Sequence, residues 1–239
     1  DGNGSVDITG TDLTIIPDAD FNGSIVASVI VSDGEYTDSD TFILTVNAVN
    51  DAPVLANVSD VSFDEDQAGS ISLTASDIDG DDLIFSITGG SDIIASLSGS
   101  DIIFSAPLNY NGSESFTVSV GDGQYNDSQD ITVTVNPVND APTANDVLGT
   151  TNEDEDISIT LDGFDIDGDD LTYVLDQDSA DGFVDIDGII ATFTPEEDFN
   201  GTTSFTYRVT DSELTSSSAT ATITVNPVND APVLADIPD

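Results

Sequence analysis

The sequence predicts an all-β protein of tandem immunoglobulin-like β-sandwiches, each with seven strands, in a linear array. The first observation is a repeat: Val-Asn-x-Val-Asn-Asp-Ala-Pro occurs at residues 46–53, 135–142 and 225–232, so a unit of about 90 residues recurs. The second is that short runs rich in β-branched residues alternate between apolar and polar positions, separated by Gly, Asn, Asp and Ser. Seven such strands in a unit of this length are typical of an immunoglobulin-like sandwich.

The repeats divide the chain into four parts. We expect the second half of a repeat at 1–50, repeats at 51–140 and 141–230, and the start of a further repeat at 231–239. No apolar run reaches transmembrane length and no signal peptide opens the chain. We therefore expect an internal piece of a longer protein, with no direct membrane insertion.

The strands of one repeat can be read in order along residues 51–140. An extended entry after Pro53 is followed by runs with period two, which face a core on one side only. The expected strands lie at 54–63, 70–75, 83–87, 93–95, 102–104, 115–120 and 130–135. The expected core residues are Phe85, Phe104, Phe116, Val118, Ile131 and Val133, and in the next repeat Tyr173, Phe193, Phe205, Tyr207, Ile223 and Val225.

Residues 1–50 match only the last strands of a repeat, at 6–8, 13–15, 25–31 and 41–46. Half a sandwich has open strand edges and an uncovered core face. Two alternatives remain at this point: the missing half lies upstream, or another chain supplies it.

The charge of the chain excludes several classes of function. There are 48 acidic residues and one basic residue, Arg208, which give a net charge of −47. Nucleic acid and anionic membranes need clustered Lys and Arg, so neither is expected as a partner. The sequence has no His, Cys or Lys, which leaves no nucleophile–base pair of the common kinds, and we expect no enzyme. Since 38% of the residues are hydrophobic, the chain should fold, and divalent cations or adaptation to high salt would relieve its self-repulsion.

One acidic motif points to calcium. Asp-Ile-Asp-Gly-Asp-Asp-Leu occurs at 77–83 and again at 165–171, each time after a predicted strand. Calcium prefers six to eight oxygen ligands, and alternate carboxylates with a Gly at the turn can supply several of them. The alternative is an acidic β-turn without a metal.

These motifs together resemble bacterial cadherin-like modules, and the likeness covers nearly the whole chain. Asn-Asp-Ala-Pro resembles the cadherin linker, Asp77-Ile78-Asp79 resembles the cadherin Asp-x-Asp loop, and Glu65 resembles the early lone Glu. The chain departs from the cadherin pattern where Asn replaces a carboxylate, at positions 22, 109, 111 and 200. The resemblance implies cadherin-like sandwiches with one to three Ca²⁺ ions at each junction.

The resemblance also implies ligand sets, position by position. The junction near residue 51 would use Asn50, Asp51, Asp77, Asp79 and Asp122. The junction near residue 140 would use Glu65, Asn139, Asp140, Asp165, Asp167 and Asp211. The junction near residue 230 would use Glu153, Asp198, Asn229 and Asp230.

Metal at the junctions predicts a mechanical function. Calcium that ties two repeats and their linker together would stiffen the array, and extracellular modules bind it with dissociation constants of about 0.1–1 mM. We therefore expect a calcium-stiffened spacer or adhesive array of a secreted or surface-anchored bacterial protein, acting in cell adhesion or biofilms. The alternatives are a subunit of a self-assembling extracellular fibre, with like chains as partners, and a polysaccharide-binding module.

Overall fold

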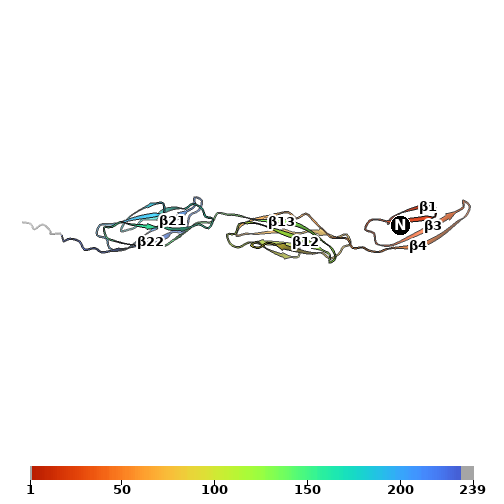
Figure 1. The fold of residues 1–239 in the computed structure, drawn as a ribbon, viewed down its shortest axis with the longest axis horizontal. Coiled ribbons are helices and arrows are strands. Elements are labelled where there is room, and N and C mark those ends of the chain that lie inside the picture. The colour runs from red at the N-terminus through yellow and green to blue at the C-terminus, as the bar shows by residue number, and fades with distance from the viewer. Residues whose placement is uncertain (1, 233–239) are drawn as a thin grey trace, which may run out of the picture. The chain divides into compact units, whose positions relative to one another are not determined.

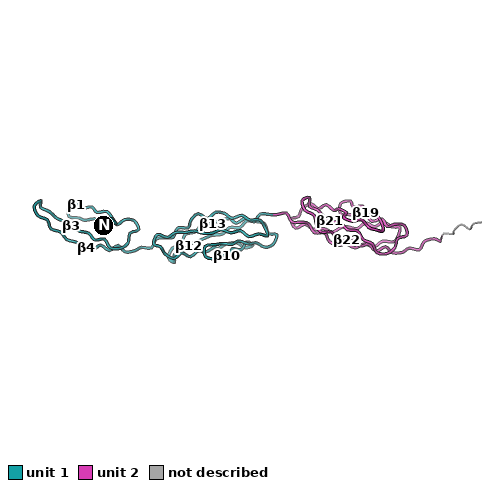
Figure 2. The backbone as a smooth tube through the Cα atoms, turned by 180° about the vertical axis from the view of Figure 1, so that it is seen from behind, with its two compact units in different colours: residues 1–137 teal, residues 138–239 magenta. Residues whose placement is uncertain are grey.

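The computed structural model describes residues 2–232, and every regular element in this range is a β-strand, which confirms the predicted all-β fold. No helix in the described range is long and apolar enough to cross a membrane. The chain divides into two compact units, residues 1–137 and 138–239 (Figure 2). The predicted start of a further repeat at 231–239 lies, except for residues 231 and 232, outside the described residues.

The first unit begins with two antiparallel hairpins (Figure 1). The strands of the two hairpins are β1 (Gly4–Thr9), β2 (Asp12–Pro17), β3 (Gly23–Ser32) and β4 (Thr37–Val46). Gly10 lies in the turn between β1 and β2 with φ +66°, a backbone conformation that Gly adopts without strain.

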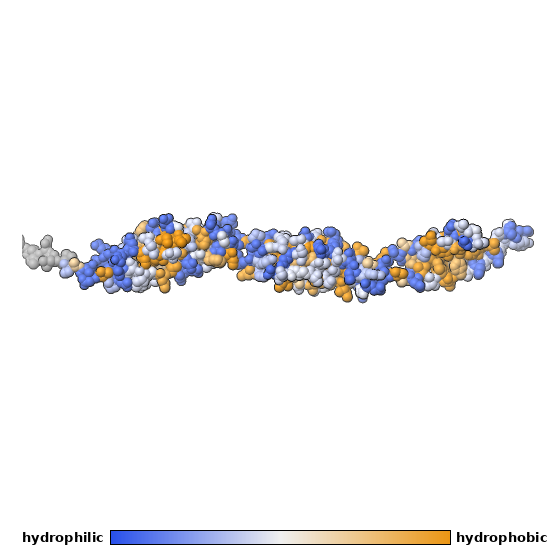
Figure 3. Space-filling model, viewed as in Figure 1, coloured by the Kyte–Doolittle hydropathy of each residue, from blue (hydrophilic) through white to orange (hydrophobic). Residues whose placement is uncertain are grey.

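The two hairpins leave apolar side chains on the surface, as expected for half a sandwich. Val31 is 66% exposed, whereas Val120, one repeat further on, is fully buried. An apolar cavity between the hairpins is lined by residues that include Val6, Ile8 and Ile25. Figure 3 shows hydrophobic residues on the surface of this part of the chain, at the right of the view.

The rest of the first unit is a β-sandwich. One sheet has the order β6-β13-β12-β9, the other has the order β10-β11-β7, and a short pair β5-β8 lies beside them. The strands are β5 (Val54–Leu55), β6 (Val61–Asp64), β7 (Ala68–Ser72), β8 (Ala75–Ser76), β9 (Ile84–Gly89), β10 (Ile94–Ser98), β11 (Asp101–Ser105), β12 (Gly112–Gly121) and β13 (Asn126–Asn136).

Side chains of both sheets meet in the core of this sandwich. The rings of Phe104 and Phe116 lie edge to face, with centroids 5.3 Å apart. Of the six core residues predicted here, five are at most 2% exposed, and Phe85 is half-buried on the edge strand β9. Gly90 has φ +75°, and its Cα faces the Phe116 ring so closely that a Cβ there would lie 2.5 Å from Cζ.

The second unit is a β-sandwich of the same kind. Its sheets have the orders β15-β22-β21-β18 and β16-β20-β19, with a short pair β14-β17. The strands are β14 (Thr143–Asn145), β15 (Val147–Asn152), β16 (Ile157–Thr160), β17 (Asp162–Phe164), β18 (Thr172–Gln177), β19 (Gly182–Asp187), β20 (Ile190–Pro195), β21 (Gly201–Thr210) and β22 (Ala219–Asn226).

Tyr207 occupies the core position that Val118 holds in the first unit, and it is fully buried. Its hydroxyl donates to the carbonyl of Asn145 and accepts a 3.1 Å hydrogen bond from the backbone N–H of Asp162. Burial raises the pKa of Tyr207. The phenol therefore joins the short pair β14-β17 to the core strand β21.

The strand predicted at 54–63 is wrong as a single element. It splits into β5, which pairs with β8, and β6, which pairs in parallel with β13. Between them Val58 N–H donates to the Gln129 side chain, and the Asp60 side chain accepts a hydrogen bond from Thr132 N–H of β13. The chain thus changes sheets where side-chain acceptors replace ladder hydrogen bonds.

Candidate cation site

The acidic loop that follows β17 is held by one of its own carboxylates. Oδ1 of Asp165 accepts hydrogen bonds from the backbone N–H groups of Asp167 (2.9 Å), Gly168 (3.1 Å) and Asp169 (3.4 Å). Gly168 has φ +82°, which lets the chain turn around this oxygen. Asp165 is only 6% exposed, and its second oxygen, Oδ2, is buried without a hydrogen-bond partner.

Three carboxylates converge in this loop. Asp165, Asp167 and Asp169 each place an oxygen within 4.8 Å of the others. Partial burial, followed by the negative charges of Asp165, Asp167 and Asp211, raises the pKa of Asp169. Because like charges repel at this distance, a cation in the cluster would stabilise the loop.

The linker before the second sandwich is bonded to this loop inside the second unit. Asn139 Nδ2 donates to Asp211 Oδ2 (2.9 Å), and the Asp140 N–H donates to Asp167 Oδ2 (2.8 Å). The backbone N–H of Leu214, then the Asn139 amide, hold the pKa of Asp211 below its ordinary value. The five residues predicted from the linker and this repeat thus form one connected group.

The first unit contains the same arrangement. Asp77 Oδ1 accepts hydrogen bonds from the N–H groups of residues 79 (2.9 Å), 80 (3.0 Å) and 81 (3.3 Å), and its Oδ2 is buried without a partner. Asp77, Asp79 and Asp81 also converge within 4.8 Å. Asn50 donates to Asp122 (2.7 Å), as its counterpart does in the second unit, and Asp51 N–H donates to Asp79 (2.8 Å). The geometry therefore follows from the motif and not from one local accident.

A pocket in the first unit brings further acids to this group. It is lined by residues of the first hairpins, the linker and the acidic loop, including Asp18, Asp20, Asn22, Asn47, Asp51 and Asp79. Side chains from the half-repeat and from the next sandwich thus face the same space.

A third cluster lies near residue 230. Asp154, Asp198 and Asp230 place oxygens within 4.8 Å of one another, and the charge of Asp198, ahead of partial burial, raises the pKa of Asp230. Beside it Glu153, 4% exposed, accepts hydrogen bonds from Val228 N–H and from Asn200 Nδ2 (2.9 Å). Asn229 donates to the carbonyl of Asp230 (3.0 Å).

Glu65 lies in the first unit, 4% exposed, and its N–H donates to the carbonyl of Asn136 (2.9 Å). The other residues predicted for the junction near 140 belong to the second unit. That they share one ion with Glu65 stays a prediction.

Sequence reasoning missed five acids of these clusters: Asp18, Asp20, Asp81, Asp154 and Asp169. Asp81 and Asp169 carry a signal, because Asp-x-Asp-Gly-Asp puts carboxylates at alternate positions, but the cadherin pattern assigned only the first two. Asp154 lies within the acidic run at 153–156, where the cadherin pattern assigned only Glu153, and Asp18 and Asp20 belong to no acidic motif that recurs in all the repeats.

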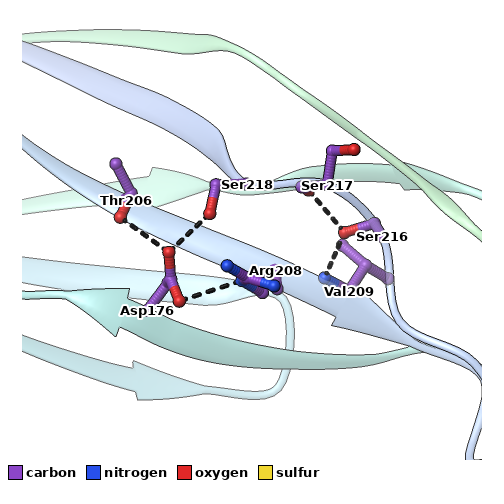
Figure 4. Close-up of polar contacts among 7 residues, drawn as sticks. All are labelled: Asp176, Thr206, Arg208, Val209, Ser216, Ser217 and Ser218. Atoms are coloured by element: carbon purple, nitrogen blue, oxygen red, sulfur yellow. Dashed lines mark hydrogen bonds and ion pairs between the residues drawn. The ribbon is translucent and has the colours of Figure 1, made fainter.

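Arg208, the only basic residue, lies away from these clusters on β21. Its Nε is 2.9 Å from Asp176 Oδ1, and Asp176 also accepts hydrogen bonds from Thr206 and Ser218 (Figure 4). Ser218, first, and the guanidinium hold the pKa of Asp176 below its ordinary value. The pair is partly exposed, so it contributes little to stability.

The sequence profile of the bacterial Ig domain matches residues 50–136 and 139–224, which is more than half of the chain. The chain belongs to the bacterial Ig domain family. The two matched ranges follow each other directly along the chain, which confirms the predicted tandem repeats of an immunoglobulin-like fold. No curated protein matches the bacterial Ig chain.

Solved structures similar to the bacterial Ig chain include cadherin ectodomains. Human protocadherin-24 EC1-2 (form II) aligns with a TM-score of 0.55 and 17% identity, over 75% of this chain and 100% of that one. Mouse protocadherin-24 EC1-3 aligns with a TM-score of 0.52 and 16% identity, over 94% and 87%. At these identities the likeness shows a shared cadherin-like fold.

A further structure is an endo-fucoidan hydrolase, MfFcnA4, from glycoside hydrolase family 107, at 20% identity and a TM-score of 0.33. The alignment covers 96% of the bacterial Ig chain but only 38% of the hydrolase.

Proposed function

We propose that this chain is a calcium-stiffened structural and adhesive array of an extracellular bacterial protein. The observation that supports it most is the buried Oδ2 of Asp165, which lacks a hydrogen-bond partner and lies in a cluster of three carboxylates. A buried carboxylate oxygen without a partner costs free energy, and a cation would offset that cost.

The residues present fit calcium better than other metals. Carboxylate, amide and backbone oxygens are hard ligands, and the motif offers no nitrogen or sulfur ligand of His or Cys. In the second unit the ligand candidates are Asp165, Asp167, Asp169, Asn139 and Asp140, with the counterparts of the first unit at 77, 79, 81, 50 and 51. Bound calcium would supply positive charge that links a linker to its sandwich.

The functional consequence is stiffness between modules. The pocket near residue 51 has acids from the half-repeat, the linker and the next sandwich, so one or more ions there would join all three. We infer that the ions fix the angle between neighbouring repeats, which would space or present other parts of a surface or secreted protein in cell adhesion or biofilms. Extracellular modules bind calcium with dissociation constants of about 0.1–1 mM, so the proposal places the chain outside the cell.

The proposal includes no catalytic role, because junction acids serve assembly and the sequence has no His, Cys or Lys. Self-assembly into a fibre and polysaccharide binding stay alternatives. Electron microscopy with and without calcium would reveal fibres, and sedimentation with polysaccharides would reveal binding.

Thermal unfolding with chelator, calcium or magnesium tests the proposal. At ten times its dissociation constant, calcium should stabilise a module by about 1.4 kcal/mol and raise Tm by about 5–10 °C. Asp167→Asn should weaken calcium binding, measured by titration calorimetry. Asp185→Asn, a matched control on the exposed face of β19, should not. Equal Tm values in chelator and calcium, with no heat of binding, would refute the proposal.

A further inference from the structure

An Asn-Gly pair marks the start of a long strand in each repeat: the Asn precedes β3, β12 or β21, and the Gly is the first residue of that strand. The pairs are Asn22-Gly23, Asn111-Gly112 and Asn200-Gly201. Their glycines have φ +133°, +154° and +143°, a region that side-chain-bearing residues rarely adopt. The backbone thus requires the Gly, and the preceding residue is an amide in all three repeats.

We propose that these three asparagines are sites of self-modification that become carboxylates without an enzyme. The backbone nitrogen of the following Gly attacks Cγ of the Asn, a C–N bond forms, and the bond from Cγ to the amide nitrogen breaks. The proton of the Gly N–H leaves with the amide as ammonia. Water then opens the cyclic imide at either carbonyl, which gives aspartate or isoaspartate. Gly, which has no Cβ, leaves its nitrogen accessible for this attack.

Two of the new carboxylates, at positions 22 and 200, would lie in the candidate cation sites. Asn22 lines the pocket that also contains Asp18, Asp20, Asp51 and Asp79. Asn200 Nδ2 is 2.9 Å from Glu153 Oε2 and 3.3 Å from the carbonyl of Asp198. Conversion of Asn200 removes a donor from a buried carboxylate and adds a negative charge beside it. The expected effect on cation binding rests on the proposed function.

The structure also predicts an order of reaction. The Asn200 amide must break its hydrogen bonds to Glu153 and to the Asp198 carbonyl before it can rotate toward Gly201. Asn22 is exposed and lines a pocket. Asn22 should therefore convert faster than Asn200.

Peptide mapping of the folded chain by mass spectrometry tests the modification. After storage in mildly alkaline buffer, the mass increase that accompanies conversion of the amide to a carboxylate should appear at all three asparagines, and earlier at Asn22 than at Asn200. Asn136 and Asn226 precede Pro, which has no N–H, so they are internal controls that cannot react this way. Asn3-Gly4 shares the chemistry but is not one of the three repeated pairs. Conversion at Asn3 with none at Asn22, Asn111 or Asn200 would overturn the proposal.

Two variants test the consequence. Asn22→Asp imitates the product and Asn22→Gln keeps the amide. We expect Asn22→Asp to bind calcium on the order of threefold to tenfold more tightly, because ligand charge tunes affinity. In chelator its Tm should be lower than that of Asn22→Gln. Equal affinities would overturn the link to cation binding. If the unmodified chain binds no calcium at all, the proposed function fails, whereas the mapping still decides the modification.

Discussion

Glu114 carries a carboxylate that holds a loop of the first unit, and replacing it gives a pH-dependent prediction. Oε1 accepts hydrogen bonds from Ser91 Oγ (2.6 Å) and Asp92 N–H (3.0 Å), while Oε2 accepts them from the N–H groups of Ser91 (2.8 Å) and Ile93 (3.1 Å). These bonds, that of the Ser91 side chain first, lower the pKa of Glu114 from 4.5 to about 2. Glu114→Gln keeps the shape but replaces one acceptor oxygen with a donor.

The magnitude follows from the pKa. A difference between 4.5 and about 2 corresponds to about 3 kcal/mol of unfolding free energy, and solvent screening of this partly exposed group reduces that to about 1–2 kcal/mol. Since the pKa of Glu114 is lower in the folded state, its contribution is present above pH 4.5 and is lost as the pH falls toward 2. Glu114→Gln should thus be less stable than the wild type at neutral pH, and the difference should disappear near the lower pKa.

Urea unfolding followed by circular dichroism, at several pH values, measures the difference between the two proteins. Comparing the proteins cancels the titration of the other acids. Hydrogen exchange at residues 91–93 should increase in the variant. The second unit has Thr203 at the position equivalent to Glu114, so no change in hydrogen exchange is expected in that unit. A difference in stability that is constant between pH 7 and pH 2 would refute the reasoning.

Two further predictions concern the cores, and urea unfolding measures both. Tyr207→Phe should lower the unfolding free energy of the second unit by about 1–3 kcal/mol, because the Asn145 carbonyl and the Asp162 N–H lose their partner. The control Tyr125→Phe, at a 49% exposed site, should change it by less than about 0.5 kcal/mol. Gly90→Ala should cost about 2–4 kcal/mol, since φ +75° disfavours Ala and its Cβ would meet Phe116. Gly99→Ala, with φ +64° and nothing within 4 Å of the new Cβ, should cost about 1–2 kcal/mol. Equal losses for the two Gly variants would contradict the packing argument.

The strands could be predicted where the alternation of apolar and polar residues within one segment is enough to identify it. Alternation in β12 and β13 fixes which side chains enter the core, so Phe116, Val118, Ile131 and Val133 were identified correctly. The segment 54–63 could not be predicted, because its break depends on Gln129 and other residues more than 70 positions away. Contacts over such distances leave no local pattern in the sequence.

The candidate site was predicted only where its acidic residues share a local motif. Asp165 and Asp167 lie in a motif whose spacing alone brings their carboxylates together. Asp154 joins Asp198 and Asp230 only because the fold places β15 beside β22 and brings a turn to the linker. Composition shows that carboxylates are abundant, whereas tertiary contacts decide which of them meet.

The acidic loops hold part of the negative charge of this chain, whose net charge is −47, by internal hydrogen bonds. Asp77 and Asp165 each use Oδ1 to accept three backbone N–H groups, so this part of the negative charge is solvated by the protein itself. The other oxygen of each carboxylate, Oδ2, is buried without a hydrogen-bond partner. The loop shape is therefore set by internal hydrogen bonds, and a cation would find its ligands already arranged. Such preorganisation lowers the cost of binding, and it means that chelation should loosen the linkers before it unfolds the sandwiches.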